Sequence, residues 1–269
     1  MVKGLYTAYT GMINEQNRMD IMTNNLANAS TVGYKKEGST SQSFDDVLTV
    51  KIKDQSVGMR NVQRLGVKNP GVKIGENYTD YSQGSFRITG NTYDLAWSGE
   101  GFFAIEFTNK AGETDTKYTR AGQFTLNKDG YLVTEEGDYV LDTQNRRIRL
   151  NTLIDSSITD DGTIYQNGQA VAKIQVTDFE DYDYLEKYGE TYYQPIQGAK
   201  TIAAKAQVKS GYLEMANVQI VSEMVNLISI TRAYESNQKV VQTIDDTLDV
   251  AVNQIGRVQE SKIKKSRYI

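Results

Sequence analysis

The stretch NNLANASTVGYKK, residues 24–36, ends a segment of helical periodicity in an unusual way. Apolar residues recur at helical spacing before it, whereas the stretch itself holds three asparagines, small residues and a glycine. Asparagine is poor inside a helix because its amide competes for backbone hydrogen bonds. Two interpretations of Asn24, Asn25 and Asn28 stay open. Either they are the frayed end of a helix that Gly33 stops, or they bridge packed helices and fix their register.

The segment before this stretch carries one thin apolar row. Leu5, Met12, Met19 and Leu26 are spaced seven residues apart on an otherwise polar sequence. A heptad row of this kind predicts a helix over residues 3 to about 31. Because one apolar row does not stabilise an isolated helix, we expect this helix to need a partner.

The end of the chain supplies a candidate for that partner. Between Ala216 and Ile255 there is no Pro or Gly, and a helix over that span would be about 60 Å long at ~1.5 Å per residue. It must therefore lie against another helix or other subunits. Its apolar positions recur every seven residues at Ile220, Leu227, Tyr234, Val241, Leu248 and Ile255. We expect a helix seam formed by Leu5, Met12, Met19, Leu227, Val241, Leu248 and Ile255.

The middle of the chain changes to strand periodicity. QFTLNKDGYLVTEEGDYVLD, residues 123–142, predicts three short strands with turns at 127–130 and 135–138. TDDGTIYQNGQAVAKIQVTDF, residues 159–179, repeats the pattern with Asp-Gly and Asn-Gly pairs, which supply the positive φ angles of tight hairpins. Residues 34–75 are polar and weakly periodic, which indicates an extended connector.

These zones predict an α+β protein. Long N- and C-terminal helices, residues 1–33 and 211–269, pair as a coiled-coil-like domain. Residues 34–75 form the extended connector, and residues 76–210 form an inserted antiparallel all-β domain.

Composition argues against an enzyme and against a bound cofactor. The chain has no Cys and no His, which removes the thiolate nucleophile, the commonest general base and the commonest metal ligands. Residues 125–136 place Asn127, Asp129, Gly130 and Glu136 at calcium-loop spacing, but Thr125 stands at the first position and the flanks alternate like strands. We therefore expect a hairpin turn there, and no metal.

Charge and hydropathy limit the partners. The formal net charge of −4 argues against a nucleic-acid surface. No stretch is long and apolar enough to span a bilayer, and the start has no apolar signal segment. We expect no direct membrane insertion and no cleaved signal peptide.

Three motifs in order resemble the rod and hook (axial) proteins of the bacterial flagellum. Residues 4–36 resemble the family's N-terminal signature, Asn-Asn-Leu-Ala-Asn followed by Thr-x-Gly-aromatic-Lys. QGSFRITGNTYDLAWSGEGFF and YTRAGQFTLNKDGYLVTEEGDYVL resemble its shared β-domain signature. SGYLEMANVQIVSEMVNLISITRAYESNQKVVQTIDDTLDVAVNQIGRV resembles its C-terminal signature.

The resemblance implies a non-enzymatic structural subunit of the flagellar basal body, exported unprocessed through the flagellar export apparatus. It implies a homo-oligomer in a helical rod that transmits torque to the hook, with other flagellar rod and hook proteins as partners. Chain length favours a rod protein with a single β domain over a hook protein. Among rod proteins, the end of the first helix and QGSFRITGN, residues 83–91, most resemble the distal rod protein or its close proximal-rod relative, and we favour the distal one. The residues expected to contact other subunits are Asn24, Asn25, Leu26, Asn28, Gly33, Arg232, Tyr234 and Asn237.

One function of another class competes with this interpretation. A secreted β-domain binding module would use the many tyrosines of the middle zone, but it leaves both heptad rows without a purpose.

Overall fold

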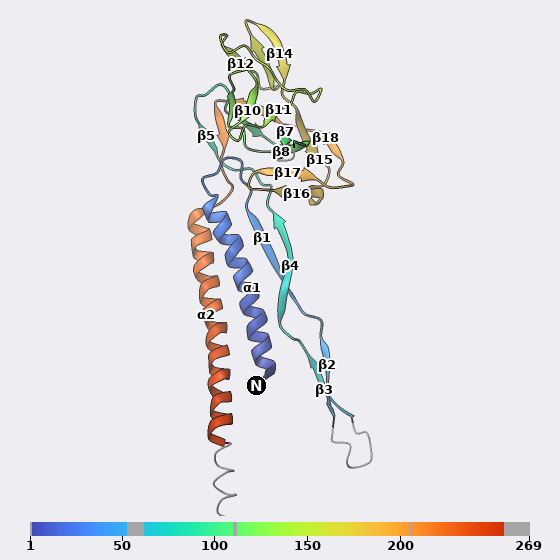
Figure 1. The fold of residues 1–269 in the computed structure, drawn as a ribbon, viewed down its shortest axis with the longest axis vertical. Helices are drawn as coiled ribbons and strands as arrows, with labels where there is room; N and C mark the ends of the chain where they lie inside the picture. The colour runs from blue at the N-terminus through green and yellow to red at the C-terminus, as the bar shows by residue number, and fades with distance from the viewer. Residues whose placement is uncertain (1, 53–61, 110–111, 205, 256–269) are drawn as a thin grey trace, which may run out of the picture. The chain divides into compact units, whose positions relative to one another are not determined.

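The computed structural model describes residues 2–52, 62–109, 112–204 and 206–255 (Figure 1). The chain forms two compact units. The first joins residues 1–24, 37–78 and 221–269, and the second joins residues 25–36 and 79–220. The predicted α+β class is confirmed, since an N-terminal helix and a C-terminal helix accompany a body that is mostly β.

The first unit holds the two long helices. Helix α1 spans Val2–Ala27, and α2 spans Ile220–Val250 and continues as a π-helical turn, Ala251–Ile255. A Cβ atom added to Gly4 would lie 3.5 Å from Cδ1 of Ile244, and one added to Gly11 would lie 3.0 Å from Nδ2 of Asn237. Because the position on α2 moves backward as the position on α1 moves forward, the two helices approach each other antiparallel (Figure 1).

One face of α2 is covered along its length. Its less exposed side chains alternate at spacings of three and four residues, with Thr231 as one further member. Spacing of this kind places them on one side of a helix. Ile230 and Glu223 are buried, and Oε2 of Glu223 has no hydrogen-bond partner within the described residues. The regularly spaced set is Glu223, Leu227, Ile230, Tyr234, Asn237, Val241, Ile244, Leu248 and Ala251.

Two ribbons fill the segment that we expected to be an extended connector. Strand β1, Glu37–Ser43, pairs with β4, Val72–Thr79, and β2, Val47–Ile52, pairs antiparallel with β3, Val62–Lys68. These strands lack the alternation that identifies a half-buried strand, because most of the side chains described on them are exposed on both faces. Backbone pairing therefore orders them, and periodicity could not reveal it.

Polar side chains fasten the ribbons to α1. Nδ2 of Asn14 donates a hydrogen bond to Oγ of Ser41 at 2.9 Å, and Oγ1 of Thr7 donates to the carbonyl of Pro70 at 3.4 Å. The side chain of Asn14 is buried, so this hydrogen bond fixes its orientation. No apolar pattern in the sequence indicates that Asn14 is buried.

The second unit is built from antiparallel sheets. Strand β6, Leu95–Ser98, pairs with β19, Gln207–Ser210, and β5, Phe86–Ile88, pairs with β20, Tyr212–Glu214. A three-stranded sheet contains β12 Ser156–Ile158, β13 Thr163–Gln166 and β14 Gln169–Lys173. A nine-stranded sheet of the described residues contains β7 Phe102–Thr108, β8 Thr114–Thr119, β9 Phe124–Leu126, β10 Leu132–Thr134, β11 Tyr139–Val140, β15 Val176–Phe179, β16 Leu185–Tyr188, β17 Tyr192–Pro195 and β18 Thr201–Ala203. A single 3-10 turn, Tyr182–Tyr184, precedes β16.

The predicted hairpins are confirmed. Strands β9, β10 and β11 pair in sequence, so residues 123–142 fold as three short strands. The turn between β13 and β14 places Asn167 at φ 51° and Gly168 at φ 74°, the left-handed pair that a two-residue hairpin requires.

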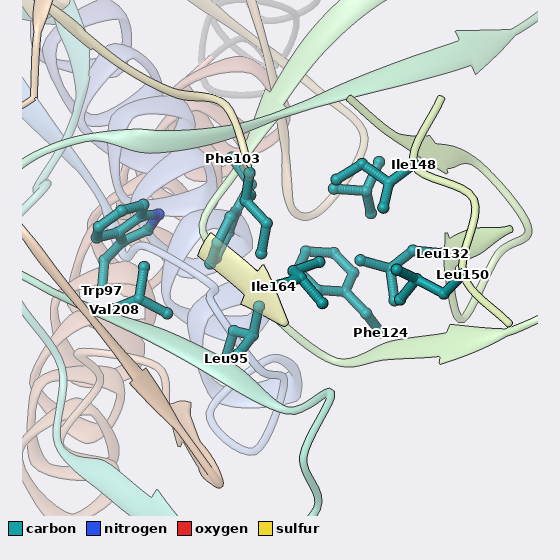
Figure 2. Close-up of a cluster of buried hydrophobic side chains, with 11 residues drawn as sticks. Leu95, Trp97, Phe103, Phe124, Leu132, Ile148, Leu150, Ile164 and Val208 are labelled. Atoms are coloured by element: carbon teal, nitrogen blue, oxygen red, sulfur yellow. The ribbon is translucent and has the colours of Figure 1, made fainter. Parts of the chain in front are cut away.

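Alternate residues of β7 belong to two different cores. Phe103 packs with Trp97 at 5.4 Å and Phe124 at 5.1 Å between ring centroids, in the cluster drawn in Figure 2. Phe102 packs in a second cluster with Phe179 and Tyr193. Because successive strand residues point to opposite faces, this sheet is covered on both sides at β7.

Candidate functional site at the end of the asparagine stretch

Helix α1 ends before it reaches Gly33. The helix ends at Ala27, and a short turn follows in which the N–H of Thr31 donates to the carbonyl of Asn28 at 3.1 Å. Val32 then forms an isolated antiparallel bridge with Met215. The expectation that Gly33 stops the helix is therefore wrong, since five residues lie between it and the last helical residue, Ala27.

Gly33 serves a close backbone approach in the second unit. It is buried with φ +71°, and a Cβ atom there would lie 2.3 Å from the backbone nitrogen of Ala121. Its N–H donates to the carbonyl of Glu214 at 2.8 Å. Any side chain here would collide with the backbone and would adopt an unfavourable φ angle.

Asn25 makes its contact within the same chain. It is buried, and its Oδ1 accepts a hydrogen bond at 3.0 Å from the hydroxyl of Tyr34, which is fully buried. The ring of Tyr34 in turn lies 4.3 Å below Nζ of Lys187. The asparagine therefore fixes the turn back from the helix end onto the body.

Asn28 faces the surface instead. Its Nδ2 donates to Oε2 of Glu190 at 2.8 Å, and its Oδ1 accepts from the hydroxyl of Thr31 at 3.0 Å. Asn25 and Asn28 thus have different surroundings although they stand three residues apart.

Lys35 anchors a buried ion cluster. Its Nζ donates to Oε1 of Glu214 and to the carbonyl of Ser82, both at 2.7 Å. Oε2 of Glu214 lies 3.4 Å from Nη1 of Arg120, which also donates to the carbonyl of Gly99 at 2.9 Å. The N–H of Gly84 donates to Oε1 of Glu214 at 3.0 Å.

All three charged members of the cluster are buried, with Lys35 and Glu214 completely so. Burial lowers the pKa of Lys35 below its ordinary value, and the neighbouring Glu214 carboxylate opposes this shift. A carboxylate between two cations is held in place only while both partners remain, because an unpaired buried charge is strongly unfavourable.

Asn217 ties the entering and leaving segments together. Its Oδ1 accepts from the N–H of Lys36 at 2.8 Å, and its Nδ2 donates to the carbonyl of Asp80 at 2.7 Å. With the bridge between Val32 and Met215, the two segments are joined where the chain enters and leaves the body.

The other residues expected at subunit contacts or in the helix seam take varied positions. Asn24 and Arg232 are exposed, whereas Leu26, Tyr234 and Asn237 are half-buried. Leu5, Met12, Met19, Leu227, Val241 and Leu248 are also half-buried. The side chain of Ile255 and the basic end of the chain lie outside the described residues. A role for any of these residues in contacts between copies stays a prediction.

Sequence reasoning missed Arg120, Glu214 and Asn217. Each stands within a stretch that resembles the family signatures, but no periodicity marks it. The available signal was charge, since Arg120 and Glu214 each lie among small or apolar residues in short strands or at their ends.

The calcium-like loop is a hairpin, as expected. Oδ1 of Asn127 accepts from the N–H groups of Asp129 at 3.0 Å and Tyr131 at 2.8 Å, so it closes the turn between β9 and β10. In the described part of the chain no three metal-ligating side chains gather. No described helix is long and apolar enough to cross a membrane.

Comparison with known proteins agrees with this arrangement. Residues 5–35 match the model of the flagella basal body rod protein, residues 96–168 match the D1 domain of the flagellar hook protein FlgE/F/G, and residues 209–255 match the C-terminal model of the flagellar basal body rod FlgEFG protein. The chain is 34% identical to the flagellar basal-body rod protein FlgG of Bacillus subtilis, covering 94% of this chain and 99% of that protein. The chain belongs to the flagellar basal-body rod protein family.

Similarity extends to both named kinds of rod protein. The flagellar basal-body rod protein FlgF of Caulobacter vibrioides is 32% identical over 96% of this chain and its own full length. The flagellar hook-basal body complex protein FlhO of Bacillus subtilis is 30% identical over 96% of this chain. This rod protein is a structural, non-enzymatic component, and its place is the flagellar basal body.

Proposed function

We propose that the chain is a structural subunit of the flagellar rod that assembles with copies of itself into a helical tube and transmits torque to the hook. End-to-end similarity to a rod protein carries this proposal, because the match covers both helices and the β body and not one domain alone. Its other partners are the neighbouring rod and hook proteins and the flagellar export apparatus.

The two terminal helices, α1 and α2, act in this proposal as a coiled-coil-like domain. The covered row on α2 and the approach of Gly4 and Gly11 to that helix support the pairing. The inserted β domain, residues 76–210, accompanies these helices, and the ion pair between Lys35 and Glu214 joins the segments that enter and leave the β body.

We place the chain at the distal end of the rod. The end of the first helical segment and the stretch QGSFRITGN, residues 83–91, support this position, because they resemble the distal rod protein. The proximal rod is the alternative, since the same stretches also resemble the proximal-rod relative.

Electron microscopy of isolated basal bodies from cells that produce a tagged chain tests the proposal. We expect a gold label on the rod next to the hook. A label confined to the membrane-proximal end of the rod would favour the proximal position. Absence of the chain from washed basal bodies, with the chain present in the culture medium, would favour a secreted binding module.

A further inference from the structure

Each long helix of the first unit carries an exposed apolar stripe. On α1 it consists of Tyr6, Tyr9 and Ile13, which are 62%, 54% and 39% exposed. On α2 it consists of Val221, Met224, Val225 and Ile228. We call these the α1 stripe and the α2 stripe. Residues spaced by three, four and seven share one helix face, so each stripe is continuous.

Each stripe faces away from the other helix of the same chain. Gly4 and Gly11 mark the side of α1 that approaches α2, and at about 100° per residue Tyr6, Tyr9 and Ile13 lie on the far side. On α2 the buried Ile230 marks the covered side, and Val221 and Ile228 lie roughly opposite to it. Neither stripe can therefore be buried by the pairing within one chain.

The stripes also lie at opposite ends of the helix pair, because the two helices run antiparallel (Figure 1). Gly4 lies opposite Ile244 and Gly11 opposite Asn237, so that residue 9 stands level with residue 239. The α2 stripe begins at the other end of that helix, close to its start at Ile220. A contact between the two stripes consequently needs two copies of the chain.

We propose that the α1 stripe of one copy packs on the α2 stripe of the next copy. This inference rests on the proposed function, since it identifies the surfaces that join subunits. In a helical assembly, each copy is related to the next by a rotation about the assembly axis and a translation along it. All copies then point the same way along that axis. Since α1 and α2 are antiparallel within one chain, α1 of one copy also runs antiparallel to α2 of the next. Tyr6 then meets Ile228, Tyr9 meets Val225, and Ile13 meets Val221.

A second copy fits these stripes better than a lipid surface does. Both stripes span the same length, residues 6–13 and 221–228. The two tyrosine rings of the α1 stripe would meet the branched aliphatic side chains of Ile228 and Val225. Neither segment contains Lys or Arg, the residues that interfacial helices use toward anionic lipid. The single charge, Glu223, is buried on the covered side of α2. The two surfaces are therefore uncharged where they would meet.

The pairing fixes how far neighbouring copies are displaced. Within one chain, Tyr9 stands level with residue 239. If Tyr9 packs on Val225 of the next copy, that copy is displaced by about 14 residues of helix, or ~21 Å along the helix axis at about 1.5 Å per residue. The α1 stripe and the α2 stripe are different surfaces. A series of bound copies therefore has one unoccupied stripe at each end. Heterologous contacts of this kind build rings or helical assemblies and not closed two-fold dimers.

Cysteine cross-linking tests this arrangement without background, because the chain contains no Cys. Tyr9→Cys with Val225→Cys is introduced into the full chain, and washed basal bodies are oxidised and resolved on a non-reducing gel. We expect a ladder of linked copies. The matched control is Tyr9→Cys with Lys239→Cys, because Lys239 is exposed on the same outward face and represents copies without displacement. It should give no ladder.

Other outcomes overturn the inference. Dimers from either single variant would show that a stripe meets itself, and a ladder only from the Lys239 pair would show that copies are not displaced. No linked product in basal bodies that contain the chain would sink this inference and leave the proposed function standing. Absence of the unsubstituted chain from basal bodies would overturn both.

A charge pair keeps the test decisive where cysteine variants fail to assemble. Ile13→Lys alone and Val221→Glu alone should each reduce incorporation into basal bodies at least tenfold, because each buries an unpaired charge. Both changes in one chain place opposite charges at the same contact and should restore incorporation. Failure of the combination to recover incorporation would argue against the pairing.

Discussion

Nζ of Lys35 lies 2.7 Å from Oε1 of Glu214, although 179 residues separate the two along the chain. Both side chains are fully buried, and Arg120 and the carbonyl of Ser82 complete their surroundings. The pair joins the segment that enters the β body to the segment that leaves it. The ion pair can therefore form only when the entering and leaving segments of the β body lie together.

Replacing Lys35 with Met should destabilise the second unit by about 3–5 kcal/mol, since Glu214 would lose its nearest counter-charge while remaining buried. Lys173→Met is the matched control, because Lys173 pairs with Asp161 at 2.9 Å on the exposed surface. That change should cost less than about 1 kcal/mol. Urea unfolding followed by the tryptophan fluorescence of Trp97 measures both. Equal effects would show that burial of the Lys35 pair contributes nothing.

Gly33→Ala should destabilise the body more than Gly90→Ala does. Both glycines have a left-handed φ angle, +71° and +76°, so the conformational cost of about 1–2 kcal/mol is shared. A Cβ at Gly33 would collide with the backbone of Ala121, whereas nothing lies within 4 Å of one at Gly90. Thermal unfolding of the two variants separates the collision from the φ cost. Similar midpoints would contradict the close approach.

The ion pair between Glu106 and Arg147 should make stability depend on acid pH. Arg147 donates to both carboxylate oxygens, at 2.6 and 3.0 Å, and this hydrogen bonding holds the pKa of Glu106 below its ordinary value of 4.5. A lowered pKa in the folded state stabilises above the unfolded pKa, and that contribution is lost as pH falls through the folded value.

Glu106→Gln should therefore be less stable than the parent by about 0.5–1 kcal/mol at neutral pH, since Arg147 is partly exposed. The difference should vanish at pH values below the lowered pKa of Glu106, where both states of the parent carry a protonated Glu106. Urea unfolding at several pH values measures it. A difference that stays constant with pH would assign the loss to packing and not to the charge.

Leu248→Asp should block rod assembly and motility while the β body stays folded. Leu248 belongs to the covered row of α2, and a buried unpaired carboxylate there costs several kcal/mol in each copy. Val250→Asp, two residues away on the exposed side, is the control and should retain motility. Motility in soft agar, with export of the variant verified in the medium, measures the effect. If cells with Leu248→Asp swim normally, that row does not face a partner.

Calcium should leave the thermal midpoint of the chain unchanged. The turn at residues 127–130 is closed by hydrogen bonds to Asn127, and a ligand that bound only the folded state would raise the midpoint. Differential scanning calorimetry with and without millimolar calcium measures this. A rise that disappears in Asp129→Ala would mean that the loop binds the ion.

The sequence predicted those parts of the fold that periodicity and turn chemistry control. The heptad row placed both helices, and the Asn-Gly pair at 167–168 placed a hairpin, because a helix face and a positive φ angle depend on neighbouring residues alone. The ribbons of residues 37–79 escaped prediction, since their strands are exposed on both faces and carry no alternation.

The polar contacts could not be predicted from spacing. Asn25 and Asn28 look equivalent in the sequence, yet one is buried against Tyr34 and the other donates to Glu190. Gly33 fits a helix stop by composition, but its neighbour is Ala121, far away in the chain. The contacts of Asn28 and Gly33 span more than 80 residues and are set by the topology of the sheets, which no local pattern encodes.

The closure of the body also orders events in folding. A contact between residues 179 apart forms late, because the entropy of closing so long a loop must be overcome before the contact contributes. Until Glu214 is in place, Lys35 lacks its nearest counter-charge, and β5 lacks its partner strand β20. A chain that ends before residue 214 therefore lacks both the buried partner of Lys35 and strand β20, so its β body is left without the ion pair that joins its two ends.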